Sequence, residues 1–191
     1  WLLHKPGFHD GKINFNKNDF IFGYGEKFST FEYPIKEINT LYLTYIMTDI
    51  YYQTNFDDRQ GSCHMIRKGK NKKSIHSKDS LLIDRMAHEE LNNIFNEKKY
   101  FISYDSYTFY SIYASLCGCI SIVVPEEGVT KEEWHPKIED RYGLAYGFDD
   151  IEYAKDTKHK MIRYVNEQQE LNLKSVKYFA ESCKKYFSIG I

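Results

Sequence analysis

The feature that most constrains the fold is the stretch Tyr100–Pro125, which has the pattern of two buried strands joined by a helix. Tyr100–Ser103 and Ile120–Val124 are apolar runs, typical of strands that are covered on both faces in a parallel sheet. Between them, one apolar stripe recurs at helical spacing, formed by Tyr107, Tyr110, Ala114 and Cys117. A helix between two parallel strands makes a crossover unit, so we expect an α/β fold with a parallel sheet.

Strand and helix patterns also occur on both sides of this unit. We expect strands at Phe20–Tyr24 and Ser62–Ile66. Leu41–Thr54 is expected to form one long strand or two with a kink near Asp49, and Tyr142–Tyr146 a short strand or an extended turn. Helices are predicted over residues 87–97, 130–135, about 150–169 and 173–187, the second one opened by a capping box of Thr130 and Glu133. The tyrosine-rich strands before residue 60 fit an α/β domain less well, and form either an edge hairpin or a junction with another domain.

The charge balance, the cysteine spacing and the missing motifs argue against several classes of protein. The 26 basic and 27 acidic residues nearly cancel, so no overall field attracts nucleic acid, and we expect no nucleic-acid partner. The four cysteines lack the CxxC spacing of zinc and redox sites, which favours buried thiols in a reducing cytosol. No HExxH motif, His/Cys cluster or DxD motif is present, and we expect neither a metal site nor a cofactor. The sequence also lacks an apolar run long enough to span a membrane.

Polar residues follow both strands of the crossover unit, where parallel sheets bind their ligands. Asp105, Ser106, Tyr107 and Thr108 follow the first strand, and Glu126 and Glu127 follow the second. The first group has two interpretations. Ser106, Tyr107 and Thr108 hold the diphosphate of a nucleotide at a helix start, or Asp105 or Ser106 simply caps that helix. Glu126 and Glu127 either accept hydrogen bonds from sugar hydroxyls or form an exposed acidic turn, with Gly128 giving the backbone freedom.

A basic run, Arg67–Lys73, follows the strand predicted at Ser62–Ile66. Lys68 on its glycine-containing turn is well placed for a phosphate. The alternative is a solvated basic loop, an interpretation that Lys72 and Lys73 favour. The run is not a Walker loop, because the GxxxxGK[ST] pattern is absent.

The run FISYDSYTFYSIYASLCGCISIVVPEEGVTKEEWHP resembles the C-terminal region of glycosyltransferases encoded in bacterial capsule and lipopolysaccharide loci. The resemblance implies the Rossmann-like C-terminal domain of a GT-B enzyme, which takes a nucleotide-sugar donor and a glycan acceptor without metal. It further implies that Asp105, Tyr107 and Thr108 lie near the donor, with Lys68 as a diphosphate cation and Glu126 or Glu127 facing the donor. The chain lacks the paired glutamates of the commonest retaining pattern, so retention or inversion stays open.

The opening WLLHKPG resembles the linker of such enzymes, so we expect an N-terminal domain to precede it. Residues 1–60 would then be linker and edge strands, and residues 61–191 the nucleotide-sugar-binding domain. The implied location is the cytoplasm, with peripheral association at the inner face of the membrane as an open alternative. Two other functions also stay open: a non-catalytic α/β module that binds a nucleotide or a protein, and a transferase of another group onto capsule sugar.

Overall fold

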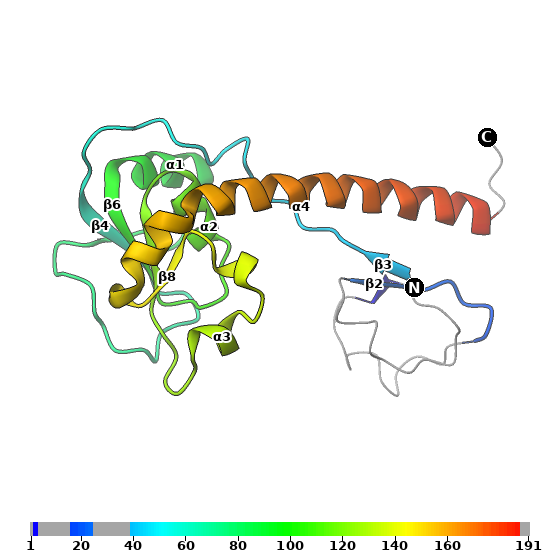
Figure 1. Ribbon diagram of the computed structural model, residues 1–191, viewed down its shortest axis with the longest axis horizontal. Coiled ribbons are helices and arrows are strands. Elements are labelled where there is room, and N and C mark those ends of the chain that lie inside the picture. Colours follow the sequence, from blue (N-terminus) through cyan, green and yellow to red (C-terminus); the bar gives the residue numbers. More distant parts are fainter. Residues whose placement is uncertain (1, 4–15, 25–38, 188–191) are drawn as a thin grey trace. The chain divides into compact units, whose positions relative to one another are not determined.

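The computed structural model describes residues 2–3, 16–24 and 39–187 (Figure 1). These residues form two compact units, one made of Trp1–Tyr45 with Asn166–Ile191 and the other of Ile46–Val165. The long helix α4 (Ile151–Tyr186) contributes residues to both. The expected N-terminal domain and the expected boundary between residues 60 and 61 stay predictions.

The second unit is built on a five-stranded, wholly parallel sheet in the order β5-β4-β6-β7-β8. The predicted α/β class with a parallel sheet and flanking helices is therefore confirmed, and it is consistent with a Rossmann-like fold. The strands are β4 (Gln60–Met65), β5 (Leu81–Leu82), β6 (Lys98–Ser103), β7 (Ile120–Val123) and β8 (Leu144–Tyr146). The helices are α1 (His88–Glu97), α2 (Tyr110–Leu116) and α3 (Lys131–Trp134), with 3₁₀ turns at Ile138–Arg141 and Phe148–Asp150.

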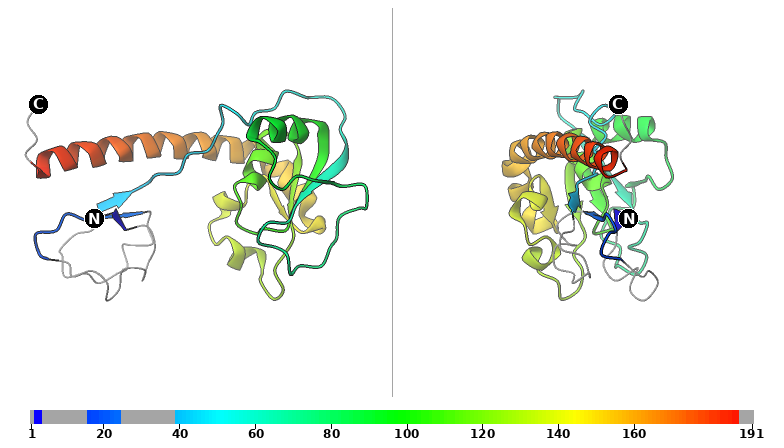
Figure 2. Two further views of the ribbon diagram at one scale, coloured as in Figure 1. Left: turned by 180° about the vertical axis from the view of Figure 1, so that it is seen from behind. Right: turned by 90° about the vertical axis from the view of Figure 1, so that its right-hand side faces the viewer.

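Both faces of this sheet are covered, which explains the apolar runs in the sequence (Figure 2). Phe101 of β6 packs with Phe95 of α1 and with α2 in the main core cluster. On the opposite face, Ile122 of β7 packs with Ala154 in the first turns of α4. Alternate residues of each central strand thus enter different clusters.

The direction in which successive strands are added to the sheet reverses between β4 and β6. From β4 the chain moves outward to β5, then returns through α1 to β6 on the other side of β4. Parallel sheets bind ligands at the carboxyl ends of the strands on either side of such a reversal. A ligand site is therefore expected among the residues that follow Met65, at the end of β4, and Ser103, at the end of β6.

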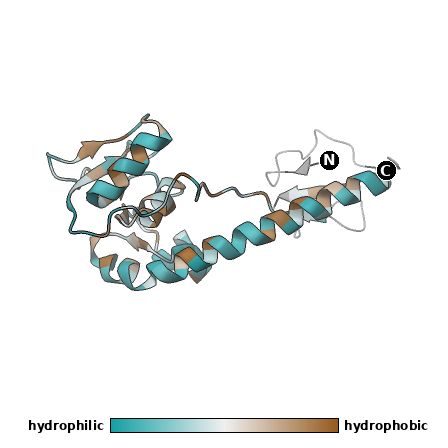
Figure 3. Ribbon diagram, turned by 90° about the horizontal axis from the view of Figure 1, so that it is seen from above, coloured by the Kyte–Doolittle hydropathy of each residue, from teal (hydrophilic) through white to brown (hydrophobic). Residues whose placement is uncertain are grey.

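The first unit contains a small parallel sheet of β1 (Leu2–Leu3), β2 (Phe22–Tyr24) and β3 (Asn39–Leu41). The C-terminal half of α4 packs on it through edge-to-face contacts such as Phe22 with Phe179, at 4.8 Å between ring centroids. Apolar residues form separate patches on an otherwise hydrophilic α4 (Figure 3).

Two predicted elements are wrong. Leu41–Thr54 is not a long strand, since β3 ends at Leu41 and the following residues are extended or turn. Within this stretch, Ile46 and Tyr51 enter the main core cluster instead, with the Tyr51 ring stacked on Tyr113 of α2 at 4.2 Å between centroids. The two C-terminal helices are one continuous α4, because no glycine or proline interrupts the residues between them.

Several local predictions are confirmed. The helix over residues 87–97 is α1, and the strand at Ser62–Ile66 lies within a residue or two of β4. Thr130 and Glu133 form the capping box of α3. The strand predicted at Tyr142–Tyr146 is β8, and that at Phe20–Tyr24 is β2. Of the predicted linker and edge strands at residues 1–60, residues 1, 4–15 and 25–38 lie outside the described residues.

Candidate functional site at the carboxyl ends of the sheet

The loop that follows β4, residues 66–73, carries five cationic side chains and is here called the basic loop. Its turn is closed by hydrogen bonds from the Gly69 amide to the Ile66 carbonyl and from the Lys72 amide to the Gly69 carbonyl. A Cβ atom at Gly69 would lie 2.2 Å from the Tyr104 carbonyl oxygen. Only glycine allows the loop to pack this closely on the end of β6.

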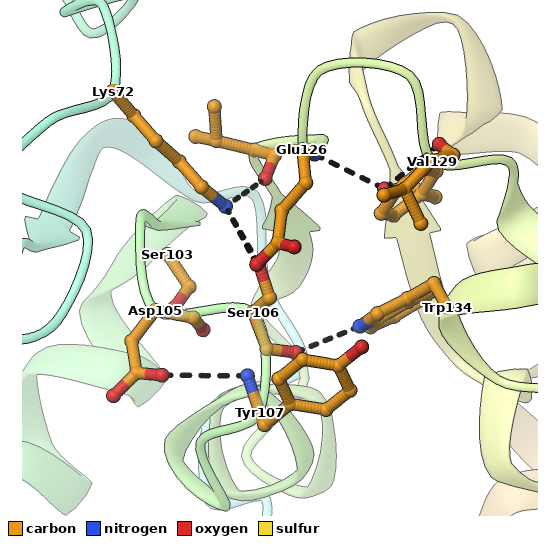
Figure 4. A network of polar contacts seen from close by, with 10 residues as sticks. Lys72, Ser103, Asp105, Ser106, Tyr107, Glu126, Val129 and Trp134 are labelled. Carbon is orange, nitrogen blue, oxygen red and sulfur yellow. Dashed lines mark hydrogen bonds and ion pairs between the residues drawn. The ribbon is translucent and has the colours of Figure 1, made fainter.

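Lys72 fastens the basic loop to the ends of β6 and β7 (Figure 4). Its Nζ donates to Ser106 Oγ at 2.6 Å and to the Val124 carbonyl at 2.7 Å, and lies 4.0 Å from a Glu126 carboxylate oxygen. Burial lowers the pKa of Lys72, while the carboxylates of Glu126 and Asp105 act in the opposite direction. Lys72 thus bridges three segments that lie far apart in the sequence.

The residues after β6 form two side-chain turns before any helix begins. Asp105 Oδ1 accepts a hydrogen bond from the Tyr107 amide, and Thr108 Oγ1 accepts one from the Tyr110 amide. The Ser106 carbonyl accepts a hydrogen bond from Trp134 Nε1 at 2.8 Å. Asp105 and Ser106 are both almost fully buried.

Both interpretations of these residues placed them at the start of a helix, and that placement is wrong: neither Asp105 nor Ser106 caps the helix, and Ser106, Tyr107 and Thr108 precede it. Helix α2 begins at Tyr110, and its N-cap residue, Phe109, makes no side-chain capping bond. The predicted stripe is wrong at its first position as well. Tyr107 precedes the helix and is 61% exposed, whereas Tyr113, Ala114 and Cys117 are buried. The helix begins only after the two turns, because the Asp105 and Thr108 side chains accept hydrogen bonds from backbone amides that a helix start would leave unpaired.

A pocket of about 330 Å³ lies between the basic loop and these turns. Lys68 lines it together with Asp105, Tyr107 and Thr108. Its other walls are cationic or aromatic: Arg67, His88, Phe109, Tyr110 and Tyr113, with Met47. The Arg67 guanidinium lies over the Tyr110 ring, 5.2 Å from its centroid. The structure thus brings four predicted site residues together, and their role in binding a donor stays a prediction.

The remaining predicted residues lie outside the lining of this pocket. Ser106 is turned toward Lys72, and Glu126 approaches Lys72 from the end of β7. The Glu126 amide donates to the Tyr146 hydroxyl, which in turn donates to the Val129 carbonyl. Glu127 is exposed on the turn that Gly128 completes with a φ of +74°. A direct ligand contact from Glu127 would require a ligand that extends beyond the pocket.

Sequence reasoning missed the role of Lys72, which it counted only in favour of a solvated basic loop, one of the two interpretations left open. The lysine lies 34 positions before its partner Ser106, and no local pattern distinguishes it from the exposed Lys73. The glycine three positions before Lys72 was the one available signal, since a turn there directs the chain back over the sheet.

Comparisons with protein-family models, with curated proteins and with solved structures found no match to this chain. Among the described residues, no helix is both long and apolar enough to cross a membrane. No group of three or more His, Cys, Asp or Glu side chains suited to a metal ion occurs in the same ranges.

Proposed function

We propose that this chain binds the nucleotide-sugar donor of a glycosyltransferase of GT-B type, which extends a bacterial surface glycan. One observation carries the proposal: Lys68 and Arg67 share a pocket with Asp105, Tyr107 and Thr108 where the chain order of a parallel sheet reverses. Cations, a carboxylate and exposed aromatic rings at that position match the three parts of a nucleotide sugar. The resemblance of residues 101–136 to the donor-binding region of such enzymes supports the same assignment.

Each part of the donor has a matching group in the pocket. The diphosphate suits Lys68 and Arg67, since both are exposed cations. The hydroxyls of ribose or of the sugar suit the Asp105 carboxylate, which accepts hydrogen bonds. A planar base suits the rings of Tyr107 and Phe109, two lining residues that are 61% and 47% exposed.

The chemistry follows from the leaving group. The bond between the anomeric carbon and the diphosphate oxygen breaks, and the nucleoside diphosphate leaves with the electron pair. The acceptor hydroxyl oxygen bonds to the anomeric carbon and loses its proton to a base. Lys68 and Arg67 stabilise the negative charge that grows on the diphosphate.

A thermal-shift panel of UDP-, GDP- and CDP-linked sugars tests the proposal. A ligand that binds the folded state alone raises the unfolding temperature, so we expect one nucleotide sugar to do so. Lys68→Ala and Thr108→Ala should each weaken that binding by about tenfold, the size of one lost hydrogen bond to a charged group. Lys78→Ala is the matched control, because Lys78 is exposed beyond the basic loop and lines neither pocket described here.

The panel also contains the results that would reject the proposal. If no nucleotide sugar shifts the unfolding temperature, a protein-binding α/β module becomes the better interpretation. If a nucleotide sugar binds equally well to the parent chain, Lys68→Ala and Thr108→Ala, the donor site lies elsewhere. Donor binding without glycosyl transfer by the full enzyme would favour a transferase of another group.

A further inference from the structure

A second and larger cavity, of about 910 Å³, adjoins the first pocket on the side of β5. Residues that follow β4 and β5 line it, together with Leu91 of α1. Arg67, Lys68 and Tyr110 line both cavities and so form the wall between them. A ligand in the first pocket would therefore lie directly beside this second space.

The cavity carries an excess of positive charge. Four cationic side chains line it, Arg67, Lys68, Lys70 and Arg85, against the single carboxylate of Asp84. That carboxylate is already engaged, because its oxygens accept hydrogen bonds from the Ile66 amide at 2.9 Å and the Arg67 amide at 3.3 Å. Within the described ranges, none of the four cations forms an ion pair.

Two of these cations have an unfavourable backbone conformation. Arg67 has a φ of 40° and Arg85 a φ of 71°, and they are the two non-glycine residues with positive φ in the described part of the chain. Such a conformation costs an L-residue free energy, and residues that keep it cluster at active sites and ligand clamps. Arg67 follows β4 and Arg85 follows β5. Asp84 immediately precedes Arg85, and its carboxylate accepts a hydrogen bond from the Arg67 amide.

The floor of the cavity is apolar. Met65, Ile83 and Leu91 close its inner side and are each at most 2% exposed. The accessible apolar surface comes from Leu82, which is 47% exposed, and from the half-buried Met86 and Tyr110. A surface of this kind suits the C–H face of a sugar ring, while the cations at the rim suit an anionic substituent. A free inorganic ion would leave the apolar floor uncovered.

We propose that this second cavity is a subsite for an anionic sugar, whose carboxylate or phosphate is bound by Arg85 and Lys70. The inference rests on the proposed function, since the neighbouring pocket would hold the donor. The proposed glycosyltransferase would then act on a sugar that carries an acidic group, on the donor or on the acceptor.

Amide NMR spectra of the labelled full chain test the subsite with three probes that differ at one carbon: glucose, glucuronate and glucose 6-phosphate. We expect glucuronate, glucose 6-phosphate or both to shift the signals of residues 66–70 and 82–86, while glucose does not. A stronger effect of glucuronate would assign a carboxylate as the ligand group, and a stronger effect of glucose 6-phosphate a phosphate. The proposal fails if neither anion shifts these signals or if glucose shifts them equally.

Variants separate the subsite from the donor pocket. Arg85→Gln and Lys70→Gln should each weaken binding of the anionic sugar by about tenfold, with Lys78→Gln as the matched control. Arg85→Gly should weaken it equally while the unfolding temperature stays the same or rises, because glycine suits the φ of 71°. Unchanged binding in Arg85→Gln and Arg85→Gly would overturn the subsite.

Failure of the subsite is distinguishable from failure of the donor site. If nucleotide sugars bind in a way that depends on Lys68 and Thr108 while the anionic sugars do not bind, the donor site stands and the subsite falls. If the anionic sugars bind through Arg85 while no nucleotide sugar binds, the subsite stands as an anion site and the proposed function falls.

Discussion

The two ends of the five-stranded sheet use their charged and polar groups in opposite ways. At the amino ends, the Arg59 guanidinium donates to the backbone carbonyls of Phe95, Asn55 and Cys117. At the carboxyl ends, Arg67, Lys68, Lys70 and Arg85 face two cavities without an ion-pair partner among the described residues. Arg59 thus holds the fold together at the amino ends, whereas these four cations stay available to a ligand at the carboxyl ends.

A cavity alone does not distinguish the two ends. The amino ends also border a cavity, of about 500 Å³, lined by Asp57, Asp58, Arg59 and Lys99 among others. There the carboxylates balance the cations in number, and Arg59 is engaged by three carbonyls. We therefore base the functional assignment on the unbalanced charge and its position relative to the strand order, not on the presence of a hollow.

The largest effect on stability should come from the amino end. Asn96 is 5% exposed, and its Oδ1 accepts hydrogen bonds from the Thr54 and Asn55 amides. Asn96→Ala leaves both amides without that acceptor, so we expect a loss of about 3 kcal/mol in the free energy of unfolding. Urea denaturation measures it, with the exposed Asn93→Ala of the same helix as control. A loss equal to that of the control would contradict the structural role of this end.

The next largest effect should distinguish Gly69 from Gly128, which lie in two different turns at the carboxyl end of the sheet. Gly69→Ala places a methyl group against the Tyr104 carbonyl and must displace the basic loop, at about 2 kcal/mol of stability. We also expect it to abolish nucleotide-sugar binding, because Lys68 moves with the loop. Gly128→Ala is the control: Gly128 has a positive φ, so about 1 kcal/mol is lost, but a Cβ there meets no atom within 4 Å and binding persists. Equal binding by both variants would remove the basic loop from the site.

Loss of Lys72 should affect binding more than stability. Lys72→Met removes the tether to Ser106 and Val124, so the basic loop is freer and nucleotide-sugar affinity falls by about tenfold. The free energy of unfolding should change by less than about 1 kcal/mol, because a buried ammonium also carries a desolvation cost. Titration calorimetry gives the affinity, and Lys73→Met, at an exposed neighbouring position, is the matched control. Unchanged affinity would show that Lys72 has no part in positioning Lys68.

The smallest expected effect is a pH dependence at the carboxyl end. His64 of β4 is 6% exposed, and its ring stacks on His76 at 3.6 Å between centroids. Burial, and then His76, lower the pKa of His64 below its ordinary 6.5, against the opposing effect of Asp84. The unfolded chain then binds more protons than the folded one, so stability falls as the pH drops through 6.5 toward the folded pKa, and the loss is complete below it.

Denaturation at about pH 7.5 and about pH 5.5 tests this dependence, since histidine changes its charge in that interval. His64→Gln should show a smaller loss of stability on acidification than the parent chain. An equal loss in both would assign the pH dependence to other groups.

The sequence predicted the layers of the second unit because local patterns determine them. The apolar runs of β6 and β7, the stripe of α1 and the capping box at Thr130 each depend on residues a few positions apart. The same patterns placed Asp105 and Thr108 after the end of β6, and parallel sheets bind ligands at the carboxyl ends of their strands.

What could not be predicted depends on contacts between distant residues. The strand expected at Leu41–Thr54 has β-prone residues but finds no neighbouring strand after Leu41, and Tyr51 buries against Tyr113 instead. The role of Lys72 depends on Ser106 and Val124, which no spacing in the sequence connects to it. The positive φ of Arg85 is likewise a property of the folded loop.

The most direct test of the difference between the two ends is a map of amide chemical shifts on adding the nucleotide sugar that most raises the unfolding temperature. The account predicts that the perturbed signals lie in residues 66–72 and 104–110, at the carboxyl ends of β4 and β6. Perturbations confined to residues 53–60 and 118–120, at the amino ends, would contradict it.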